Sequence, residues 1–362
     1  MNTYFIPHRH NMLLRAFFLH IVILCFLSPM LHAVGNTEAD TAMDGKSSIT
    51  LRFSTYHSYR NPAVNTFITK LKQGSENHID IDVFYGATLL KKAELLHGIS
   101  EGIVDIGAIN PIFYPQILSL HAKMPAFSHV PVSMQEKIKA MEKIYAQYPE
   151  FLREIEKFQQ HVLFQLFPQP MAIISSVPVK SIEDIQGLRI RASSRVFIRI
   201  LRSLGANPVS LPLEDCYIAL QTGTIDGMFT TIDTIHSLRL HELASYSFTS
   251  PQIAFIIPHS YTIRSNTWDQ LNEDFKNAAK QASFEASDRA AQTYESSFYE
   301  YIQEQEKNGV EVTIADEEDL AQWHALPVFE NLRNEFAKEA ESKGVKDGEQ
   351  MVEDIKSILS VE

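Results

Sequence analysis

The sequence predicts an α/β fold of two similar lobes, and three observations support this prediction. A short unit occurs twice, at residues 93–107 and 216–227: an amphipathic helix ends at a glycine, and an aspartate then opens a strand. Helix-like and strand-like segments alternate, as in sheets joined by right-handed crossovers. Between His259 and Asn308 there is no glycine and no proline, which favours a long helix. Two lobes predict a cleft, and a cleft predicts a ligand.

The first lobe is expected to contain a β-α-β-α-β run. Pro62 suits the first position of a helix, and Gly102 suits the left-handed position just past one. A further helical stretch is expected to break near Pro149. The predicted elements, in order, are strand 49–55, helix 61–72, strand 79–85, a helix from residue 91, strand 106–109 and helix 135–160.

The second lobe is expected to repeat the pattern. Gly205 and Gly223 again suit positions after helices, and Ser193 or Ser194 suits a helix N-cap. The predicted elements, in order, are strand 161–167, a short helix after Ser181, strand 187–192, a helix to residue 204, strand 207–211, helix 214–222, strand 227–230 and an apolar strand at 254–257.

Residues 269–307 predict one helix with a face of small residues and Phe275. Such a helix is ~50 Å long at 1.5 Å per residue, so we expect it to brace both lobes. Two shorter helices are the alternative. The expected fold is two mainly parallel sheets flanked by helices. Lobe I is expected to comprise 49–167 plus about 257–296, and lobe II 168–256 plus about 297–362.

The N-terminal segment predicts export. Residues 1–33 combine a positive start, an apolar run and a small-residue cleavage site near Ala33, as in a signal peptide. An uncleaved anchor is the alternative. Residues 34–48 are small and polar, which predicts a linker. After cleavage only Cys216 of the two cysteines remains, so no disulfide is expected within the chain.

The composition excludes several classes of function. The formal net charge is −12, which argues against a nucleic-acid-binding protein. No nucleophile elbow, phosphate-binding glycine loop or zinc-protease motif occurs, so we expect neither an enzyme nor a bound cofactor. His236 and His241 are five residues apart, a poor spacing for one helix face, and no metal site is expected.

Two arginines near the end of one strand are the most informative charges. Arg189 and Arg191 alternate with apolar residues, so both lie on one face of their strand. Ligands of open α/β sheets collect beyond the carboxyl ends of strands, where a guanidinium grips a carboxylate. A structural ion pair is the alternative for Arg191. Asp105 and Asp226 are interpreted as aspartates that bond to their own turns rather than to a ligand.

Three motifs resemble a known family when taken together. They are Asp184-Ile185-Gln186-Gly187-Leu188-Arg189-Ile190-Arg191, then 205–209 (GANPV), then 219–227 (ALQTGTIDG), with Trp268-Asp269-Gln270-Leu271 before the long helix as support. In this order and spacing they are similar to the dicarboxylate-binding-protein type of solute-binding protein from TRAP (tripartite ATP-independent periplasmic) transporters. The resemblance covers residue 51 to the C-terminus. It implies a periplasmic two-lobed receptor that closes on an organic acid and delivers it to a membrane permease.

The resemblance also implies a set of ligand-binding residues. The family arginine that binds the substrate carboxylate corresponds to Arg191. Thr230 stands where better-known members carry asparagine, and Met171 stands near the place of a second arginine. Both departures reduce polarity, so we expect a monocarboxylate in a mostly apolar pocket. The residues expected to contact it are Arg191, Thr230, Thr231, Phe229, Phe167, Gln169, Tyr56, Asn110, Phe113 and Tyr114.

The expected partners are therefore a small organic acid and the TRAP permease subunits, with the receptor itself a monomer. Two other readings remain open. The same fold can serve as a ligand-sensing module for a membrane receptor. An exported hydrolase is a weaker alternative, because no nucleophile–base motif is visible.

Overall fold

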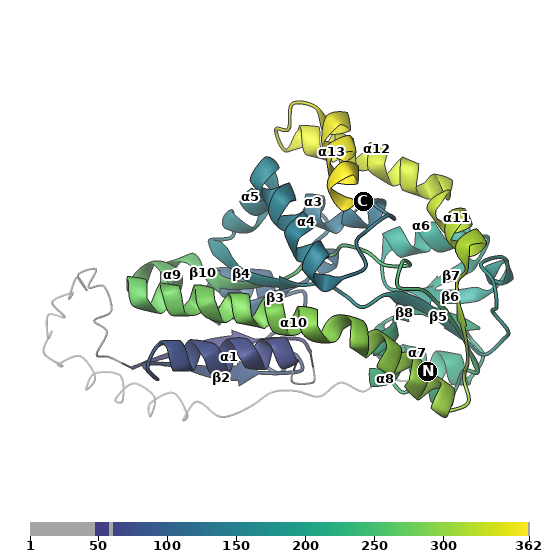
Figure 1. Ribbon diagram of the computed structural model, residues 1–362, viewed down its shortest axis with the longest axis horizontal. Helices are drawn as coiled ribbons and strands as arrows, with labels where there is room; N and C mark the ends of the chain where they lie inside the picture. Colours follow the sequence, from purple (N-terminus) through teal and green to yellow (C-terminus); the bar gives the residue numbers. More distant parts are fainter. Residues whose placement is uncertain (1–47, 58–60, 361–362) are drawn as a thin grey trace, which may run out of the picture. The chain divides into compact units, whose positions relative to one another are not determined.

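The computed structural model describes residues 48–57 and 61–360, in which two mixed β-sheets are flanked by helices (Figure 1). The predicted signal peptide and nearly all of the predicted linker lie outside the described residues. Sheet A has the strand order β2-β1-β3-β10-β4, and sheet B has the order β11-β9-β5-β8-β6-β7. The strands are β1 (Ile49–Ser54), β2 (Ile79–Phe84), β3 (Ile106–Ile109), β4 (Gln160–Leu166), β5 (Met171–Ser175), β6 (Arg189–Ala192), β7 (Asn207–Ser210), β8 (Gly227–Thr231), β9 (Tyr246–Thr249), β10 (His259–Arg264) and β11 (Glu311–Ile314).

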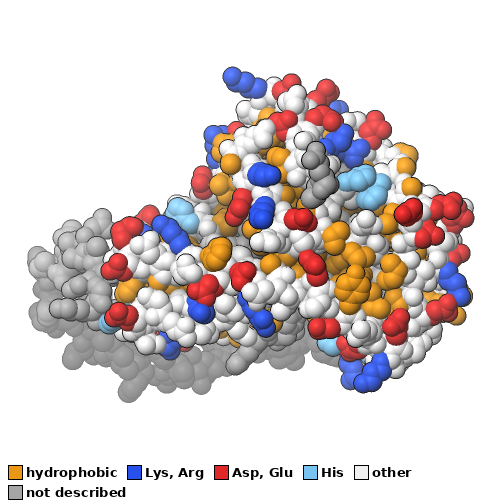
Figure 2. All heavy atoms as spheres, viewed as in Figure 1, with side chains coloured by type: hydrophobic (Ala, Val, Ile, Leu, Met, Phe, Trp, Pro, Cys, Tyr) orange, Lys and Arg blue, Asp and Glu red, His pale blue; other side chains and the backbone are white. Residues whose placement is uncertain are grey.

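Helices cover both sheets, and none in the described part of the chain is long and apolar enough to span a bilayer. Acidic side chains are interspersed with basic ones on the face that Figure 2 shows. The helices are α1 (Pro62–Gly74), α2 (Leu95–Ser100), α3 (Ser119–Ala122), α4 (Met134–Gln147), α5 (Glu150–Glu156), α6 (Arg195–Ser203), α7 (Cys216–Gln221), α8 (Ile232–Ser237), α9 (Ser265–Gln270), α10 (Glu273–Lys307), α11 (Glu317–His324), α12 (Pro327–Ser342) and α13 (Gly348–Leu359).

One strand in each sheet runs against its neighbours. In sheet A this strand is β10, antiparallel to β3 and β4. In sheet B it is β5, antiparallel to β8 and β9. The remaining pairings between described strands are parallel. The sheets are therefore more mixed than a series of β-α-β units alone would make them.

Two direct crossovers between the sheets explain the reversed strands. β4 of sheet A leads through residues 167–170 into β5 of sheet B, and β9 of sheet B leads through residues 250–258 into β10 of sheet A. A strand that enters a sheet at the carboxyl edge of its neighbours must run against them. The carboxyl edges of both sheets therefore adjoin the crossovers. The link from Leu166 to Met171 spans at most about 18 Å, so the two edges lie close together there.

The repeated glycine–aspartate unit has a structural role: it ends a helix and connects the following turn to a neighbouring strand. Gly102 and Gly223 have φ of +76° and +67°, the left-handed conformation predicted for them. Asp105 accepts a hydrogen bond of 2.8 Å from the backbone N–H of Arg52 in β1. Asp226 accepts one of the same length from the backbone N–H of Arg189 in β6. Each aspartate thus ties the end of a helix to the neighbouring strand.

The long helix is a single element, as predicted. Asn272 caps it by accepting from the N–H of Phe275, and this cap separates it from α9. α10 packs on α1, α4 and β4 towards one end and on α8 and β11 towards the other (Figure 1). Its 35 residues correspond to about 52 Å. The described residues belong to one compact unit, so the lobe boundaries remain a prediction.

The prediction of a strand at residues 254–257 was wrong. These four residues are almost fully buried, but they form part of the second crossover and do not pair in a sheet. Their apolar character reflects burial rather than strand formation. The strand begins only at His259, after Pro258, whose nitrogen has no hydrogen to donate to a neighbouring strand.

Candidate ligand-binding site

Arg191 lies at the carboxyl end of β6 with its side chain buried, 5 % exposed. Its Nε and Nη2 both donate to the carbonyl oxygen of Leu211, at 3.1 and 3.0 Å. Two hydrogen bonds from one guanidinium to one oxygen fix the plane of the group. The segment that follows β7 therefore holds the guanidinium in one orientation.

The charge of Arg191 is not neutralised by an ion pair within the described part of the chain. Burial is the main cause that lowers its pKa, which the nearby Cys216 and Glu214 oppose. Arg189, on the same face of β6, has a different environment, because its Nη2 lies 2.6 Å from a carboxylate oxygen of Asp226. A buried guanidinium without a counter-ion is a favourable place for an anion.

Only one of the two predicted threonines shares the face of Arg191. In the register of sheet B, Arg191 lies opposite Met228 of β8, so Thr230 projects to the same face. Thr230 is buried, 8 % exposed. Thr231 projects to the other face, where its Oγ1 lies 2.8 Å from the Oγ1 of Thr234 in α8. The Thr231 hydroxyl is therefore engaged with the start of a helix.

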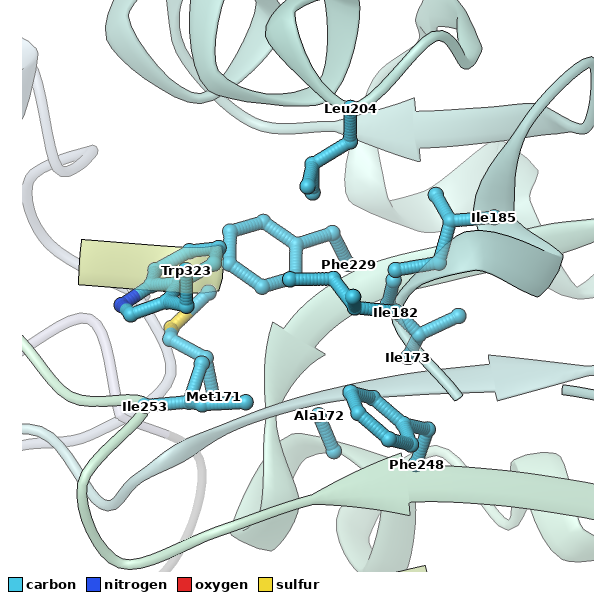
Figure 3. A pocket seen from close by; sticks show the side chains of 10 residues that line it. All are labelled: Met171, Ala172, Ile173, Ile182, Ile185, Leu204, Phe229, Phe248, Ile253 and Trp323. Atoms are coloured by element: carbon cyan, nitrogen blue, oxygen red, sulfur yellow. The ribbon is translucent and has the colours of Figure 1, made fainter. Parts of the chain in front are cut away.

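Phe229 lies on the opposite face of sheet B from Arg191, the face to which Thr231 also projects. Its ring packs edge-on against Phe197 and near Trp323, and it is 2 % exposed. Figure 3 shows it among apolar side chains around a cavity of about 10 Å³. Such a cavity holds one water molecule at most. Phe229 is thus placed in the core beneath α6 and α11.

A second polar group lies at the carboxyl edge of sheet A. Asn110 follows β3, Tyr56 follows β1, and His259 begins β10. Nδ2 of Asn110 lies 2.9 Å from Nε2 of His259, and the Tyr56 hydroxyl lies 3.5 Å from Nδ1. The ring of His57 lies 6.3 Å from that of His259. We refer to Tyr56, His57, Asn110 and His259 as the sheet A cluster.

Both histidines of the sheet A cluster are neutral at physiological pH. Burial lowers the pKa of His57 to about 4. Burial, with a smaller contribution from His57, lowers the pKa of His259 to about 3. The cluster therefore offers hydrogen bonds rather than positive charge, in contrast to Arg191.

The aromatic residues after Asn110 have separate roles. Tyr114 is buried, and its hydroxyl donates to the Lys92 carbonyl at 2.6 Å and accepts from the N–H of Leu96 at 3.1 Å. That hydroxyl is satisfied by the protein backbone. Phe113 packs edge-on against Tyr56, with the Lys92 ammonium 4.9 Å from its ring centre. Phe113 is therefore the aromatic residue next to the sheet A cluster.

Phe167 and Gln169 lie in the first crossover. Phe167 is buried in the main core. Nε2 of Gln169 donates to the carbonyl oxygen of Tyr294 at 3.0 Å, while its Oε1 is buried without a partner among the described residues. Tyr294 returns a hydrogen bond of 2.6 Å from its hydroxyl to the carbonyl of Pro168. The crossover is thus attached to α10.

The structure brings four of the predicted residues into two groups, at the carboxyl edges of sheets B and A. Arg191 and Thr230 form one group, and Tyr56 and Asn110 belong to the other. His259 and His57 were not predicted. In the sequence, His259 merely begins the run without glycine or proline. It lies beside the end of β3 because β10 is antiparallel to that strand, which the sequence did not indicate. In the described residues no three histidine, cysteine or carboxylate side chains gather as metal ligands.

Comparison with known proteins identifies the family. The profile of bacterial extracellular solute-binding proteins, family 7, matches residues 53–339. A solute-binding protein of Roseobacter denitrificans is 26 % identical over 225 residues, 61 % of this chain and 67 % of that protein. The sialic acid-binding periplasmic protein of Vibrio cholerae is 25 % identical over 163 residues, 45 % of this chain and only half of that protein's length.

Solved structures of TRAP solute-binding proteins share the fold. One from Desulfovibrio salexigens has a TM-score of 0.74 at 22 % identity, covering 86 % of this chain and 96 % of its own. The ligands bound in such neighbours vary and include galacturonate, pyroglutamic acid, orotic acid and 3-hydroxybenzoate. These proteins serve transport and are not enzymes. With the family profile covering most of its length, the chain belongs to family 7 of the bacterial extracellular solute-binding proteins, the binding proteins of TRAP transporters.

Proposed function

We propose that this protein is a periplasmic receptor that captures an organic monocarboxylate and delivers it to a TRAP permease. The observation that carries this proposal is Arg191, a buried guanidinium oriented by Leu211 and without an ion-pair partner among the described residues. The ligand carboxylate takes the place of that partner. Thr230, on the same face of sheet B, adds a hydroxyl group.

The preference for one carboxylate follows from the surroundings of Arg191. Met171 opens β5 near the place of the family's second arginine. It pairs with Thr231 and projects to the face of sheet B opposite Arg191, so this position brings no second cation to the site. The sheet A cluster is neutral. A second carboxylate would therefore lose its hydration without gaining a buried cation, which is costly.

Binding and lobe closure are coupled in this proposal. The ligand bridges Arg191 on sheet B and the sheet A cluster, and so stabilises the closed arrangement. The two crossovers are the segments about which the lobes move. The permease then recognises the closed form. A ligand-sensing role predicts instead that the closed form binds a membrane receptor, and pull-down with each candidate partner distinguishes the two.

Calorimetry with two sets of probes tests the proposal. Benzoate, 3-hydroxybenzoate and pyroglutamate represent monocarboxylates, and succinate and malate represent C4-dicarboxylates. We expect binding within the first set and none at comparable affinity in the second. Tight binding of the dicarboxylates with no binding of the monocarboxylates would contradict the proposal. The exposed Arg202 in α6 provides a matched control, because Arg202→Ala should leave affinity unchanged.

We also propose that the signal peptide is cleaved near Ala33 and that the mature receptor is a monomer. Cleavage near Ala33 is tested by measuring the mass of protein recovered from the periplasm, which should lack residues 1–33. A monomeric receptor is tested by light scattering with and without ligand, which should give the mass of one chain in both conditions. A mass for the uncleaved chain, or for two chains, would contradict the respective part.

A further inference from the structure

His259 occupies a position from which it can face a ligand held by Arg191. It is the first residue of β10, directly after the crossover from sheet B, at the carboxyl edge of sheet A. Arg191 lies at the corresponding edge of sheet B, which the same crossovers adjoin. The Tyr56 hydroxyl lies 3.5 Å from Nδ1 of the histidine, and the Phe113 ring packs edge-on against Tyr56, so aromatic rings border this part of the site.

The hydrogen bonds of Asn110 determine which nitrogen of His259 carries the proton. Oδ1 of Asn110 accepts from the backbone N–H of Ile112 at 3.0 Å. The other end of the amide, Nδ2, is therefore a donor, and it lies 2.9 Å from Nε2 of His259. Nε2 must accept this bond. In a neutral ring the proton then resides on Nδ1, which becomes the donor of the pair.

The Nδ1–H donor of His259 is poorly used within the protein. Its contact with the Tyr56 oxygen is 3.5 Å, beyond the 2.7–3.2 Å of ordinary hydrogen bonds. A partly buried donor with so long a hydrogen bond is incompletely satisfied. A shorter hydrogen bond to a ligand acceptor would therefore lower the free energy of the complex. A second carboxylate here would lose its hydration without gaining a buried cation, so a neutral oxygen is the favoured acceptor.

We propose that His259 determines specificity by donating from Nδ1 to a neutral oxygen on the ligand, a hydroxyl or carbonyl, at the end away from the carboxylate. This inference rests on the proposed function, because it requires the carboxylate to be held at Arg191. Asn110 is the positioning residue that fixes the tautomer. The ligand class is thus narrowed to oxygenated monocarboxylates.

Matched probes and two variants test the assignment. The probe pairs are benzoate with 3-hydroxybenzoate, and cyclohexanecarboxylate with 3-oxocyclohexanecarboxylate. His259→Asn places an amide near Nδ1, whereas His259→Gln places one near Nε2 only. We expect the wild-type protein to bind the oxygenated member of a pair about tenfold more tightly, the value of one hydrogen bond. His259→Asn should keep most of that preference, and His259→Gln should lose it.

Asn110→Asp provides a readout that a merely structural role would not change. A carboxylate at position 110 accepts from Nε2–H, so the Nδ1 position becomes an acceptor. The preference for 3-oxocyclohexanecarboxylate, which offers only an acceptor, should vanish. The preference for 3-hydroxybenzoate, which can donate, should persist. Nitrogen NMR of the His259 ring should report the matching change of tautomer.

The outcomes separate this inference from the proposed function. Equal affinity for both members of each pair, with binding still dependent on Arg191, overturns the role of His259 alone. Tight dicarboxylate binding, or monocarboxylate binding that survives Arg191→Ala, overturns the proposed function itself. A ring proton found on Nε2 in the wild-type protein contradicts the assigned tautomer. Circular dichroism of each variant verifies that it is folded.

Discussion

Arg191 donates two hydrogen bonds, at 3.1 and 3.0 Å, to the carbonyl oxygen of Leu211. The acceptor is neutral, so these bonds orient the guanidinium without cancelling its charge. Arg189, two residues earlier, donates to the carboxylate of Asp226 from both its backbone and its side chain. Arg191 is therefore available to bind an anion, whereas Arg189 has a structural role.

The structural task leads to a prediction for Asp226. Asp226→Ala removes three hydrogen bonds from Arg189, including the one from its backbone N–H at the start of β6. We expect a loss of about 1–3 kcal/mol in the free energy of unfolding, measured with urea, because a backbone donor is left unpaired. Ligand affinity should not change. Unchanged stability together with lost binding would instead place Asp226 in the ligand site.

The long helix should be sensitive to side-chain volume on its buried face. Ala282 is fully buried in α10, whereas the neighbouring Gln281 is exposed. Ala282→Leu should destabilise the fold by about 1–3 kcal/mol, because added methyl groups have no space. Gln281→Leu is the matched control and should change the free energy of unfolding by less than about 0.5 kcal/mol. Equal effects of the two substitutions would contradict the packing described.

Lys137 predicts a pH dependence of stability. Its Nζ is fully buried and donates to the Tyr294 hydroxyl at 2.6 Å, and burial lowers its pKa from 10.5 to about 7. Between pH 7 and 10.5 the unfolded chain therefore binds the proton more tightly than the folded protein, so stability rises with pH. This contribution has a slope of up to about 1.4 kcal/mol per pH unit.

Lys137→Met should remove this slope. Urea unfolding of both proteins at pH 7, 8 and 9 measures it, because contributions from other groups cancel in the difference. The wild-type protein should gain stability relative to the variant as the pH rises. A constant difference across the three pH values would show that Lys137 keeps its ordinary pKa in the folded protein.

The neutral sheet A cluster predicts how affinity depends on pH. The pKa values of His57 and His259 are lowered to about 4 and about 3, so both stay uncharged above pH 5. The arginine stays charged throughout. The dissociation constant of a monocarboxylate should therefore change less than about twofold between pH 5.5 and 8. A severalfold gain in affinity on acidification would show that a histidine supplies charge to the ligand.

Much of the fold was predictable because its signals are local. Gly102 and Gly223 mark helix ends through their backbone conformation, and the long helix follows from a run without breaks. β10 was missed. Tyr261 and Ile263 alternate with Ser260 and Thr262, but the stronger apolar run at 254–257 was interpreted as the strand instead. The Thr262 hydroxyl donates to Oε1 of Gln160 in β4, far away in sequence.

The site residues also divide into those with a local sequence signal and those placed by contacts between residues far apart in sequence. Arg191 could be proposed from its place at a strand end and from the family motif around it. His259 could not, because its contact with Asn110 joins residues 149 positions apart. Phe229 was expected at the ligand. Side chains alternate between the two faces of β8, so Phe229 projects to the face opposite Arg191, where it is buried in the core.

The affinity of Arg191→Ala for a monocarboxylate tests the central claim most directly. Calorimetry would compare the wild-type protein, this variant and Arg202→Ala with the tightest-binding monocarboxylate probe. Removing a buried charge partner should cost about 2–5 kcal/mol, which is a loss of at least about 30-fold. Arg202→Ala should bind as the wild type does. Full affinity in a folded Arg191→Ala protein would contradict the role of Arg191 as the carboxylate anchor.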